Sequence, residues 1–288
     1  MIFMIKNKSD LESALVELCK ITSNTLPYDV ILALKKAQEK EDGNSKIFLD
    51  LILENIKIAK QNAIPVCQDT GPPFFVVYYP KGESTNELQS TIILATEKAT
   101  KEFLRPNAVD PISEKNIGNM PEIHFQEWDK EYFQFDLMLK GAGSENVSCQ
   151  YFLPDSNLGA YGDFEGILKC ALDAVLKAQG KGCPPGILGV CIGGSRNSSM
   201  LEAKKQLFRK IDDINPNKKL FSLEKKIISE ANKLKIGTAG LGGKFTLLAV
   251  KASALPRHPA SYFVSFSYSC WALRRHSLKF KEGVIKFD

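Results

Sequence analysis

A thiol, an amide, a carboxylate and a hydroxyl stand on four consecutive residues, Cys67–Thr70 (CQDT). Gly71 and two prolines follow them, so the four groups lie in a turn. The apolar run 74–79 predicts a strand directly after the turn, and functional groups are commonly displayed at such junctions. The turn is therefore a candidate functional site, with a polar turn holding one incidental buried cysteine as the alternative.

The cysteines indicate reduced thiols and not a disulfide framework. Their number is odd, they are widely spaced, and no CxxC pair occurs. Any metal site must therefore gather ligands from distant parts of the chain. The seven are Cys19, Cys67, Cys149, Cys170, Cys183, Cys191 and Cys270.

Three of these cysteines differ from the others in context. Cys67, Cys183 and Cys270 each lie where a predicted element ends, flanked by Gly, Pro or polar residues. The other four fall in or beside amphipathic or apolar segments, where packing is the expected role. Three separated thiolates can hold zinc or an iron–sulfur cluster, and three cysteines without a fourth protein ligand leave one position open.

Two glycine-rich junctions are candidates for anion binding. In Lys140–Asn146 (KGAGSEN), two glycines let backbone N–H groups approach an anion, while Ser144, Glu145 and Asn146 supply side-chain contacts; a structural bend is the alternative. The junction Gly193–Asn197 joins a strand to a helix. It lacks the dinucleotide fingerprint and the phosphate-loop Lys-Ser/Thr pair, so no nucleotide site is expected there.

These candidate groups must be positioned by a mixed α/β (α+β) fold, a helix-rich domain with short, partly antiparallel sheets. No linker or repeat divides the chain, so residues 1–288 are expected to form a single catalytic domain. Residues 121–128 and 132–140 alternate in hydropathy and predict an antiparallel hairpin. Helices are expected at 9–21, 27–39, 44–63, 86–103, 162–179, 200–209 and 223–234, and further strands at 74–79, 186–192, 245–252 and 262–267.

Composition excludes several classes of protein. With 288 residues and 44% hydrophobic content the chain can bury a sizeable core, yet no window reaches the roughly 18 uninterrupted apolar residues of a membrane span. The N-terminus does not resemble a signal peptide, so a cytoplasmic location is expected. The net charge is +5, but Lys and Arg alternate with acids, which argues against a nucleic-acid surface.

Five segments, in this order, resemble the cluster domain of class I (iron–sulfur) fumarate hydratases and L(+)-tartrate dehydratases. They are PVCQDTGPP, KGAGSEN, GCPPGILGVCIGG, KIGTAGLGGKFT and SCWALRRH. The resemblance implies a [4Fe-4S] cluster held by Cys67, Cys183 and Cys270, with a fourth iron open to substrate.

The resemblance also implies the substrate-side residues. Gln68 and Asp69 would lie beside the cluster and touch substrate, with Asp69 a candidate for proton transfer. Arg105 would pair with a substrate carboxylate, for which its bidentate fork is suited. Gly143, Ser144 and Asn146 would line the pocket. His258 matches a histidine near the substrate, so Asp69, Gln68 and His258 are the candidate catalytic residues.

The implied activity is reversible hydration of fumarate to malate, a reaction of the tricarboxylic acid cycle, with the open iron as Lewis acid. The chain is similar to the alpha subunit of a two-subunit enzyme, which implies a separate beta subunit and an oligomer. L(+)-tartrate dehydratase and a non-catalytic metal-cluster scaffold are the alternatives. Trp271, where the family usually has His, motivates the scaffold alternative, and the retained motifs speak against it.

Overall fold

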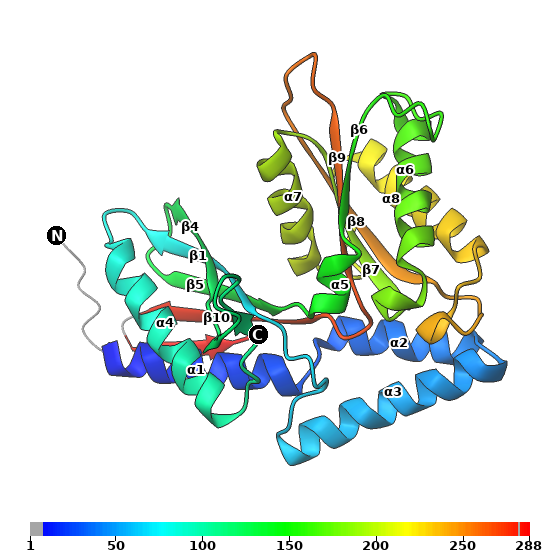
Figure 1. Ribbon diagram of the computed structural model, residues 1–288. Coiled ribbons are helices and arrows are strands. Elements are labelled where there is room, and N and C mark those ends of the chain that lie inside the picture. Colours follow the sequence, from blue (N-terminus) through cyan, green and yellow to red (C-terminus); the bar gives the residue numbers. More distant parts are fainter. Residues whose placement is uncertain (1–7, 282) are drawn as a thin grey trace. The chain divides into compact units, whose positions relative to one another are not determined.

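The computed structural model describes residues 8–281 and 283–288 and has the mixed α/β fold expected from the sequence (Figure 1). Its residues divide into two compact units that interleave along the chain. Unit 1 comprises Met1–Pro27, Asn55–Gly141 and Arg274–Asp288, and unit 2 comprises Tyr28–Glu54 and Ala142–Leu273. The interpretation of the chain as one catalytic domain stays a prediction.

The helices other than the short α5, where a glycine-rich turn was expected, lie close to the predicted ranges. They are α1 (Lys8–Asn24), α2 (Tyr28–Lys40), α3 (Gly43–Asn62), α4 (Thr85–Glu102), α5 (Ala142–Asn146), α6 (Phe164–Ala178), α7 (Arg196–Lys205) and α8 (Lys218–Lys233), with short 3₁₀ segments η1 (Gln179–Gly182), η2 (Gln206–Phe208) and η3 (Thr238–Gly240). Within the described part of the chain, none of them combines the length and the apolar character that a bilayer crossing requires.

The strands form two larger sheets and one small one. The strands are β1 (Pro73–Pro80), β2 (Ala108–Val109), β3 (Asn116–Gly118), β4 (Glu122–Trp128), β5 (Phe133–Leu139), β6 (Cys149–Phe152), β7 (Gly186–Gly193), β8 (Leu247–Leu255), β9 (Phe263–Ser269), β10 (Arg274–Lys281) and β11 (Val284–Phe287). The sheet orders are β11-β10-β5-β1-β4 and β6-β9-β7-β8, and β2 pairs with β3.

In unit 1, helices α1 and α4 pack against the five-stranded sheet (Figure 1). The apolar positions of α1 recur at helical spacing, and Leu11, Leu15 and Leu18 are completely buried. They share one core cluster with Phe75 on β1 and Leu278 on β10. The predicted amphipathic helix at 9–21 is thereby confirmed.

The predicted hairpin of 121–128 and 132–140 is wrong. Both segments are strands, β4 and β5, but β1 lies between them, parallel to β4 and antiparallel to β5. The physical reason lies in β1, where five consecutive residues from Pro73 to Val77 are buried, as in a strand covered on both faces. The partly exposed β4 takes the sheet edge instead.

The C-terminal strands β10 and β11 were not predicted, and neither was β6. Strand β10 pairs with β5 and places Arg274 opposite Leu139, next to the glycine-rich segment that follows β5. Its alternation of buried Leu278 and Phe280 with exposed Lys279 and Lys281 is a period-2 strand signal that the sequence does contain.

In unit 2, α7 covers one face of the β6-β9-β7-β8 sheet and α6 with α8 covers the other (Figure 1). Strands β7 and β8 are parallel, and β9 is antiparallel to β7. Cys170 of α6 belongs to the core of this unit, as Cys19 of α1 does in unit 1. Burial raises the pKa of each of these two thiols to about 12, so they remain protonated packing residues.

Replacement of Asp136 by Asn is expected to stabilise the protein at neutral pH. The buried Asp136 Oδ1 accepts hydrogen bonds from Ser277 Oγ (2.6 Å) and Gln134 Nε2 (2.8 Å), which an amide oxygen also accepts. Burial raises the pKa of Asp136, so stability present below the unfolded-state pKa is lost as pH rises through the folded-state pKa. Asp136→Asn should raise the free energy of unfolding by about 1 kcal/mol at pH 7 and by nothing near pH 3, measured by urea denaturation.

Asp110→Asn is the matched control of opposite sign. The backbone N–H and hydroxyl of Ser113, followed by the N–H of Ile112, hold the pKa of Asp110 below its usual value. Stability from such a group is present above the unfolded-state pKa and lost as pH falls through the folded-state pKa. Asp110→Asn should therefore lower the unfolding midpoint at pH 7 and have no effect at low pH. Equal pH dependence in both variants would contradict the assignment.

Candidate functional site

The turn that carries Cys67 lies in unit 1, directly before β1, and its backbone is anchored upstream. Val66 donates its N–H to Ser23 O (2.9 Å), and its carbonyl accepts from Asn55 Nδ2 (2.8 Å). Cys67 therefore follows a residue whose N–H and carbonyl are both hydrogen-bonded. The side chain of Cys67 is partly exposed, and that of Gln68 is exposed.

Asp69 is held by contacts within its own turn and with Arg274 of β10. Its Oδ1 accepts from the N–H of Gly71 (3.1 Å), and its carbonyl accepts from Nη1 of Arg274 (2.8 Å). A Cβ at Gly141 would lie 2.7 Å from Asp69 Oδ2 and 3.6 Å from Arg274 Nη2, so carboxylate and guanidinium both lie against this glycine. Gly71 has φ +76°, and a Cβ there would lie 2.6 Å from the Lys140 backbone. Only glycine fits both positions without displacing these groups.

Arg105 presents an exposed side chain on a fixed backbone. Its N–H donates to Thr70 Oγ1 (3.2 Å), and its carbonyl accepts from Asn119 Nδ2 (2.9 Å). Asn107 closes the network, with Nδ2 donating to Thr70 Oγ1 (2.8 Å) and N–H donating to Asn119 Oδ1 (3.1 Å). This polar network therefore joins the turn at Asp69 to the candidate carboxylate-binding residue within unit 1.

In unit 2 the sheet brings Cys183 and Cys270 together at one of its two edges formed by strand ends, where β7 begins and β9 ends. Cys183 precedes β7 and Cys270 follows β9, and the antiparallel register pairs Ile187 with Ser269. The N–H of Trp271 donates to Cys183 O (3.3 Å), which ties the two segments together. Cys183 is exposed and has a left-handed backbone with φ +49°, while Cys270 is partly exposed.

Tyr268 lies beside these two cysteines. It is 2% exposed, and its ring packs where Gly182 and Gly186 have no side chains. Burial raises the pKa of Tyr268, and negative charge on Cys270 and Cys183 raises it further. The phenol therefore stays protonated next to the two thiols.

The glycine-rich segment forms the short helix α5 instead of an open turn, and one of its side chains reaches Cys270. Ser144 is 4% exposed, and its Oγ accepts from the N–H of Cys270 (3.4 Å). Gly143 and Asn146 are exposed, and Glu145 forms an ion pair with Lys204 (3.3 Å). The structure thus unites the KGAGSEN motif with one candidate cluster ligand, and gives Ser144 a supporting position in the protein.

His258 is not brought to the two cysteines of unit 2. It lies in the connection from β8 to β9, at the sheet edge where β7 ends and β9 begins. The cysteines lie at the opposite edge, about 20 Å away along strands that rise ~3.3 Å per residue. His258 Nδ1 accepts from the N–H of Ala260 (3.1 Å), which leaves the proton of a neutral ring on Nε2.

The donor set suits an iron–sulfur cluster. Among the described residues, no group of three or more His, Cys, Asp or Glu side chains lies close enough to hold a metal ion. The cysteines nevertheless fit the chemistry, because Cys183 and Cys270 are accessible thiols at one edge and Cys67 is a third accessible thiol, in unit 1. Buried Cys19 and Cys170 differ from them in exposure and are excluded as ligands on that ground.

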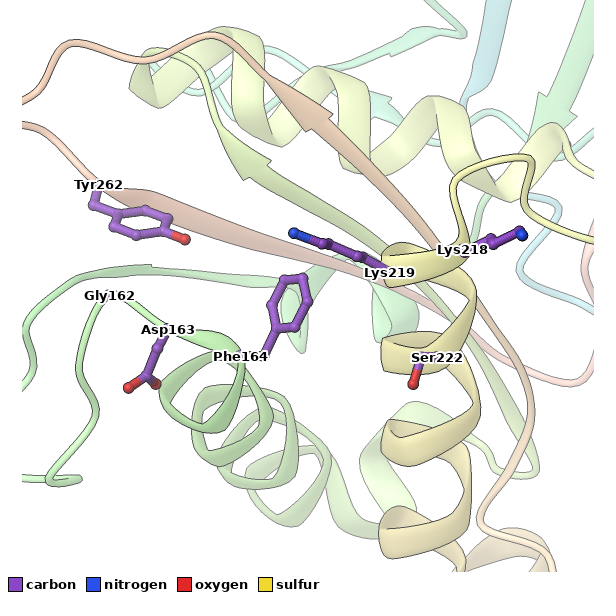
Figure 2. A pocket seen from close by; sticks show the side chains of 7 residues that line it. All are labelled: Gly162, Asp163, Phe164, Lys218, Lys219, Ser222 and Tyr262. Carbon is purple, nitrogen blue, oxygen red and sulfur yellow. The ribbon is translucent and has the colours of Figure 1, made fainter.

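An open pocket of about 550 Å³ lies in unit 2, between the start of α6, the start of α8 and the connection into β9 (Figure 2). Phe164 and Tyr262 line it together with Lys218 and Lys219 at the start of α8. None of the candidate residues lines it, so the cavity is not assigned to the site.

Sequence reasoning missed Arg274 and Tyr268 as parts of the site. Both lie close in sequence to Cys270, and Arg274 lies within the SCWALRRH segment. Their closeness in sequence to Cys270 was the signal that could have indicated them. The contacts with Asp69, Gly182 and Gly186 come from pairing between distant strands.

The fold and the site define a mixed α/β protein with paired, accessible cysteine thiols suited to a metal cluster. The family model for fumarate hydratase (fumerase) matches residues 12–279. The chain belongs to the fumarate hydratase family.

Several curated relatives are similar over most of this chain. A putative fumarate hydratase class I of Geobacillus stearothermophilus is 46% identical over 276 residues, covering 92% of this chain and 54% of the relative. The chain thus spans about half the length of that relative. A putative L(+)-tartrate dehydratase subunit alpha of Methanocaldococcus jannaschii is 38% identical and covers 92% and 95%, and the L(+)-tartrate dehydratase subunit alpha of Escherichia coli K12 is 29% identical and covers 94% and 93%.

Removal of the Thr70 hydroxyl is expected to loosen the network around Arg105. Thr70 is completely buried, and Thr70→Val leaves the Arg105 N–H and the Asn107 amide without this acceptor. We expect a loss of about 1–3 kcal/mol in the free energy of unfolding, measured by urea denaturation. Thr70→Ser keeps the oxygen and is the matched control. Equal stability of the Val and Ser variants would show that the network contributes nothing.

Proposed function

We propose that this chain is the alpha subunit of a hydro-lyase of the class I fumarate hydratase type, acting on fumarate and malate. The observation that carries the proposal is the placement of Cys183 and Cys270 at one sheet edge. Ser144 of the KGAGSEN motif accepts a hydrogen bond there from the N–H of Cys270. Membership of the fumarate hydratase family supports the same chemistry.

Cys67, Cys183 and Cys270 are the proposed ligands of a [4Fe-4S] cluster. Thiolates are the ordinary ligands of such clusters, and three of them leave one iron without a protein ligand. When bound, the cluster supplies a Lewis acid at that open iron. The protein supplies the ligand positions, and the hydrogen bonds to the backbone of Cys183 and Cys270 hold them.

Asp69 is the proposed proton-transfer residue. Its backbone is fixed by Arg274 and its Oδ1 by the Gly71 N–H, so the carboxylate keeps one orientation. Hydration adds the hydroxyl of water to one alkene carbon and a proton to the other. Asp69 Oδ2 is assigned to deliver that proton to carbon and to be reprotonated by the proton that water loses; in dehydration it takes the proton back. Gln68, with its exposed amide, is assigned to bind and orient the dicarboxylate.

Arg105 is the proposed partner of a substrate carboxylate. Its guanidinium is exposed, and a planar fork binds a carboxylate through two parallel hydrogen bonds. Gly143 and Asn146 are exposed and are assigned to the pocket lining, whereas the buried Ser144 is assigned to the support of Cys270. His258 receives no role at the cysteines because it lies at the opposite edge of the sheet.

A separate beta subunit is the proposed partner that completes the site, in an oligomeric enzyme of the cytoplasm and the tricarboxylic acid cycle. Two relatives similar over nearly their whole length are named as alpha subunits, which supports this assignment. The same names favour L(+)-tartrate dehydration as the second candidate function. A non-catalytic scaffold is disfavoured because Gln68, Asp69 and the KGAGSEN motif are all retained.

Loss of Cys67 is expected to abolish cluster binding by the chain alone. After anaerobic reconstitution the parent chain should hold about four irons and four sulfides, with broad visible absorption near ~400 nm. Cys67→Ser should hold far less of both. Cys149→Ser is the matched control, because Cys149 is also partly exposed but lies on β6 outside the proposed ligand set. Retention of the full cluster by Cys67→Ser would contradict the assignment.

Turnover is expected from the complex with the beta subunit and not from this chain alone. The complex, produced by co-expression, should hydrate fumarate, and the comparison with L-tartrate dehydration decides between the two substrates. Asp69→Asn keeps the acceptor for the Gly71 N–H but removes the carboxyl group that transfers the proton, and should lower kcat by about 10²–10⁴-fold. Full turnover by the isolated chain, or unchanged kcat in Asp69→Asn, would refute the corresponding assignment.

A further inference from the structure

Tyr268 is a buried aromatic residue that the proposed mechanism does not use. It lies on β9, two residues before Cys270, with a side chain that packs into the core of unit 2. Its ring meets the chain on both sides of Cys183, at Gly182 and at Gly186. Tyr268 therefore contacts the segment that contains Cys183, and it lies on the strand that ends directly before Cys270.

The two glycines are explained by this ring. A Cβ at Gly182 would lie 2.6 Å from Tyr268 Cε1, and a Cβ at Gly186 would lie 2.2 Å from Tyr268 Cζ and its hydroxyl oxygen. Neither glycine has a positive φ, so the backbone does not itself require glycine there. The nearest atoms at both sites all belong to Tyr268. The Tyr268 side chain is therefore the first obstacle that an added side chain would meet at either position.

Cys183 has a backbone conformation that needs support from its surroundings. Its φ of +49° is in the left-handed region, which residues other than glycine seldom adopt. Two backbone hydrogen bonds hold it, from its own N–H to Gly180 O (3.0 Å) and from the Trp271 N–H to its carbonyl (3.3 Å). Tyr268 packs against Gly182 and Gly186, on either side of Cys183 in the chain.

We propose that Tyr268 is a positioning residue that holds Cys183 in the geometry of a cluster ligand, through ring contacts at Gly182 and Gly186. The inference rests on the proposed function, because it concerns the retention of the cluster. The ring acts through the cysteine and does not touch substrate. Chains that lose the ring should still fold but should release the cluster faster.

The test compares Tyr268→Phe with Tyr268→Leu in the full chain, reconstituted anaerobically. Iron release to a chelator and the decay of the visible absorption give the rate of cluster loss. Tyr268→Phe keeps the ring and should match the parent within about twofold, whereas Tyr268→Leu should lose the cluster about tenfold faster, as is typical when a residue that orients a metal ligand is lost.

Phe266→Leu is the matched control for general destabilisation. Phe266 lies two residues earlier on β9, on the same face of the sheet, and is 1% exposed in the same core cluster. Its replacement should lower the unfolding midpoint of the apo chain as much as Tyr268→Leu does, and should leave the rate of cluster loss near that of the parent. Equally faster cluster loss in Tyr268→Leu and Phe266→Leu would show that Tyr268 acts only through core packing, and would overturn the inference.

A double-mutant cycle tests the contact itself. Gly182→Ala places a methyl group against the Tyr268 ring and should speed cluster loss in the parent background. In the Tyr268→Leu background the smaller side chain leaves room, so Gly182→Ala should add little. Additive effects of the two substitutions would overturn the proposed contact.

Failure of the inference and failure of the proposed function give different results. A parent chain that takes up no iron and sulfide overturns both. A parent chain that binds the cluster while Tyr268→Leu retains it equally long overturns the inference alone. Slow loss in the parent and in Tyr268→Phe, with fast loss only in Tyr268→Leu, supports it.

Discussion

The backbone of Gly71 lies so close to that of Lys140 that no side chain fits between them, and the site in unit 1 depends on this contact. It places the turn that precedes β1 against the end of β5, where the chain enters the glycine-rich segment. Gly141 then lies against the Asp69 carboxylate, and Arg274 at the start of β10 reaches the Asp69 carbonyl. Three strand ends thus meet at one residue, Asp69, because β1, β5 and β10 are neighbours in the sheet.

In unit 2, strand pairing places the exposed thiol of Cys183 and the partly exposed thiol of Cys270. Antiparallel pairing of β7 with β9 places the residue before one strand beside the residue after the other, which brings Cys183 and Cys270 to one edge. Tyr268 and Ser144 then fill the space behind them, one with an aromatic ring and the other with a hydroxyl acceptor. The same pairing separates His258 from these cysteines, because a strand carries its two ends to opposite edges of the sheet.

Burial separates Cys19, Cys170 and Cys191 from the three proposed ligands, whereas Cys149 is also partly exposed and differs from them in lying on strand β6. Burial keeps Cys19 and Cys170 protonated and unreactive, and both pack among apolar side chains. Cys67 and Cys270 are partly exposed, Cys183 is exposed, and each lies at the end of an element held by backbone hydrogen bonds.

Local sequence signals were sufficient for the longer helices, for about half of the strands and for the sorting of the cysteines, because helical periodicity, apolar runs and Gly-Pro breaks act over a few residues. They were also sufficient to nominate Cys67, Asp69, Cys183 and Cys270, since reactive groups at element ends are visible in a single chain. The tertiary structure alone decided that β1 separates β4 from β5, that β10 joins their sheet, and that His258 lies far from Cys183. It also revealed the contacts of Arg274 with Asp69 and of Tyr268 with Gly182 and Gly186. Strand order and register depend on contacts between residues distant in sequence, and the free energy of those contacts depends on which faces become buried together, which no local pattern contains.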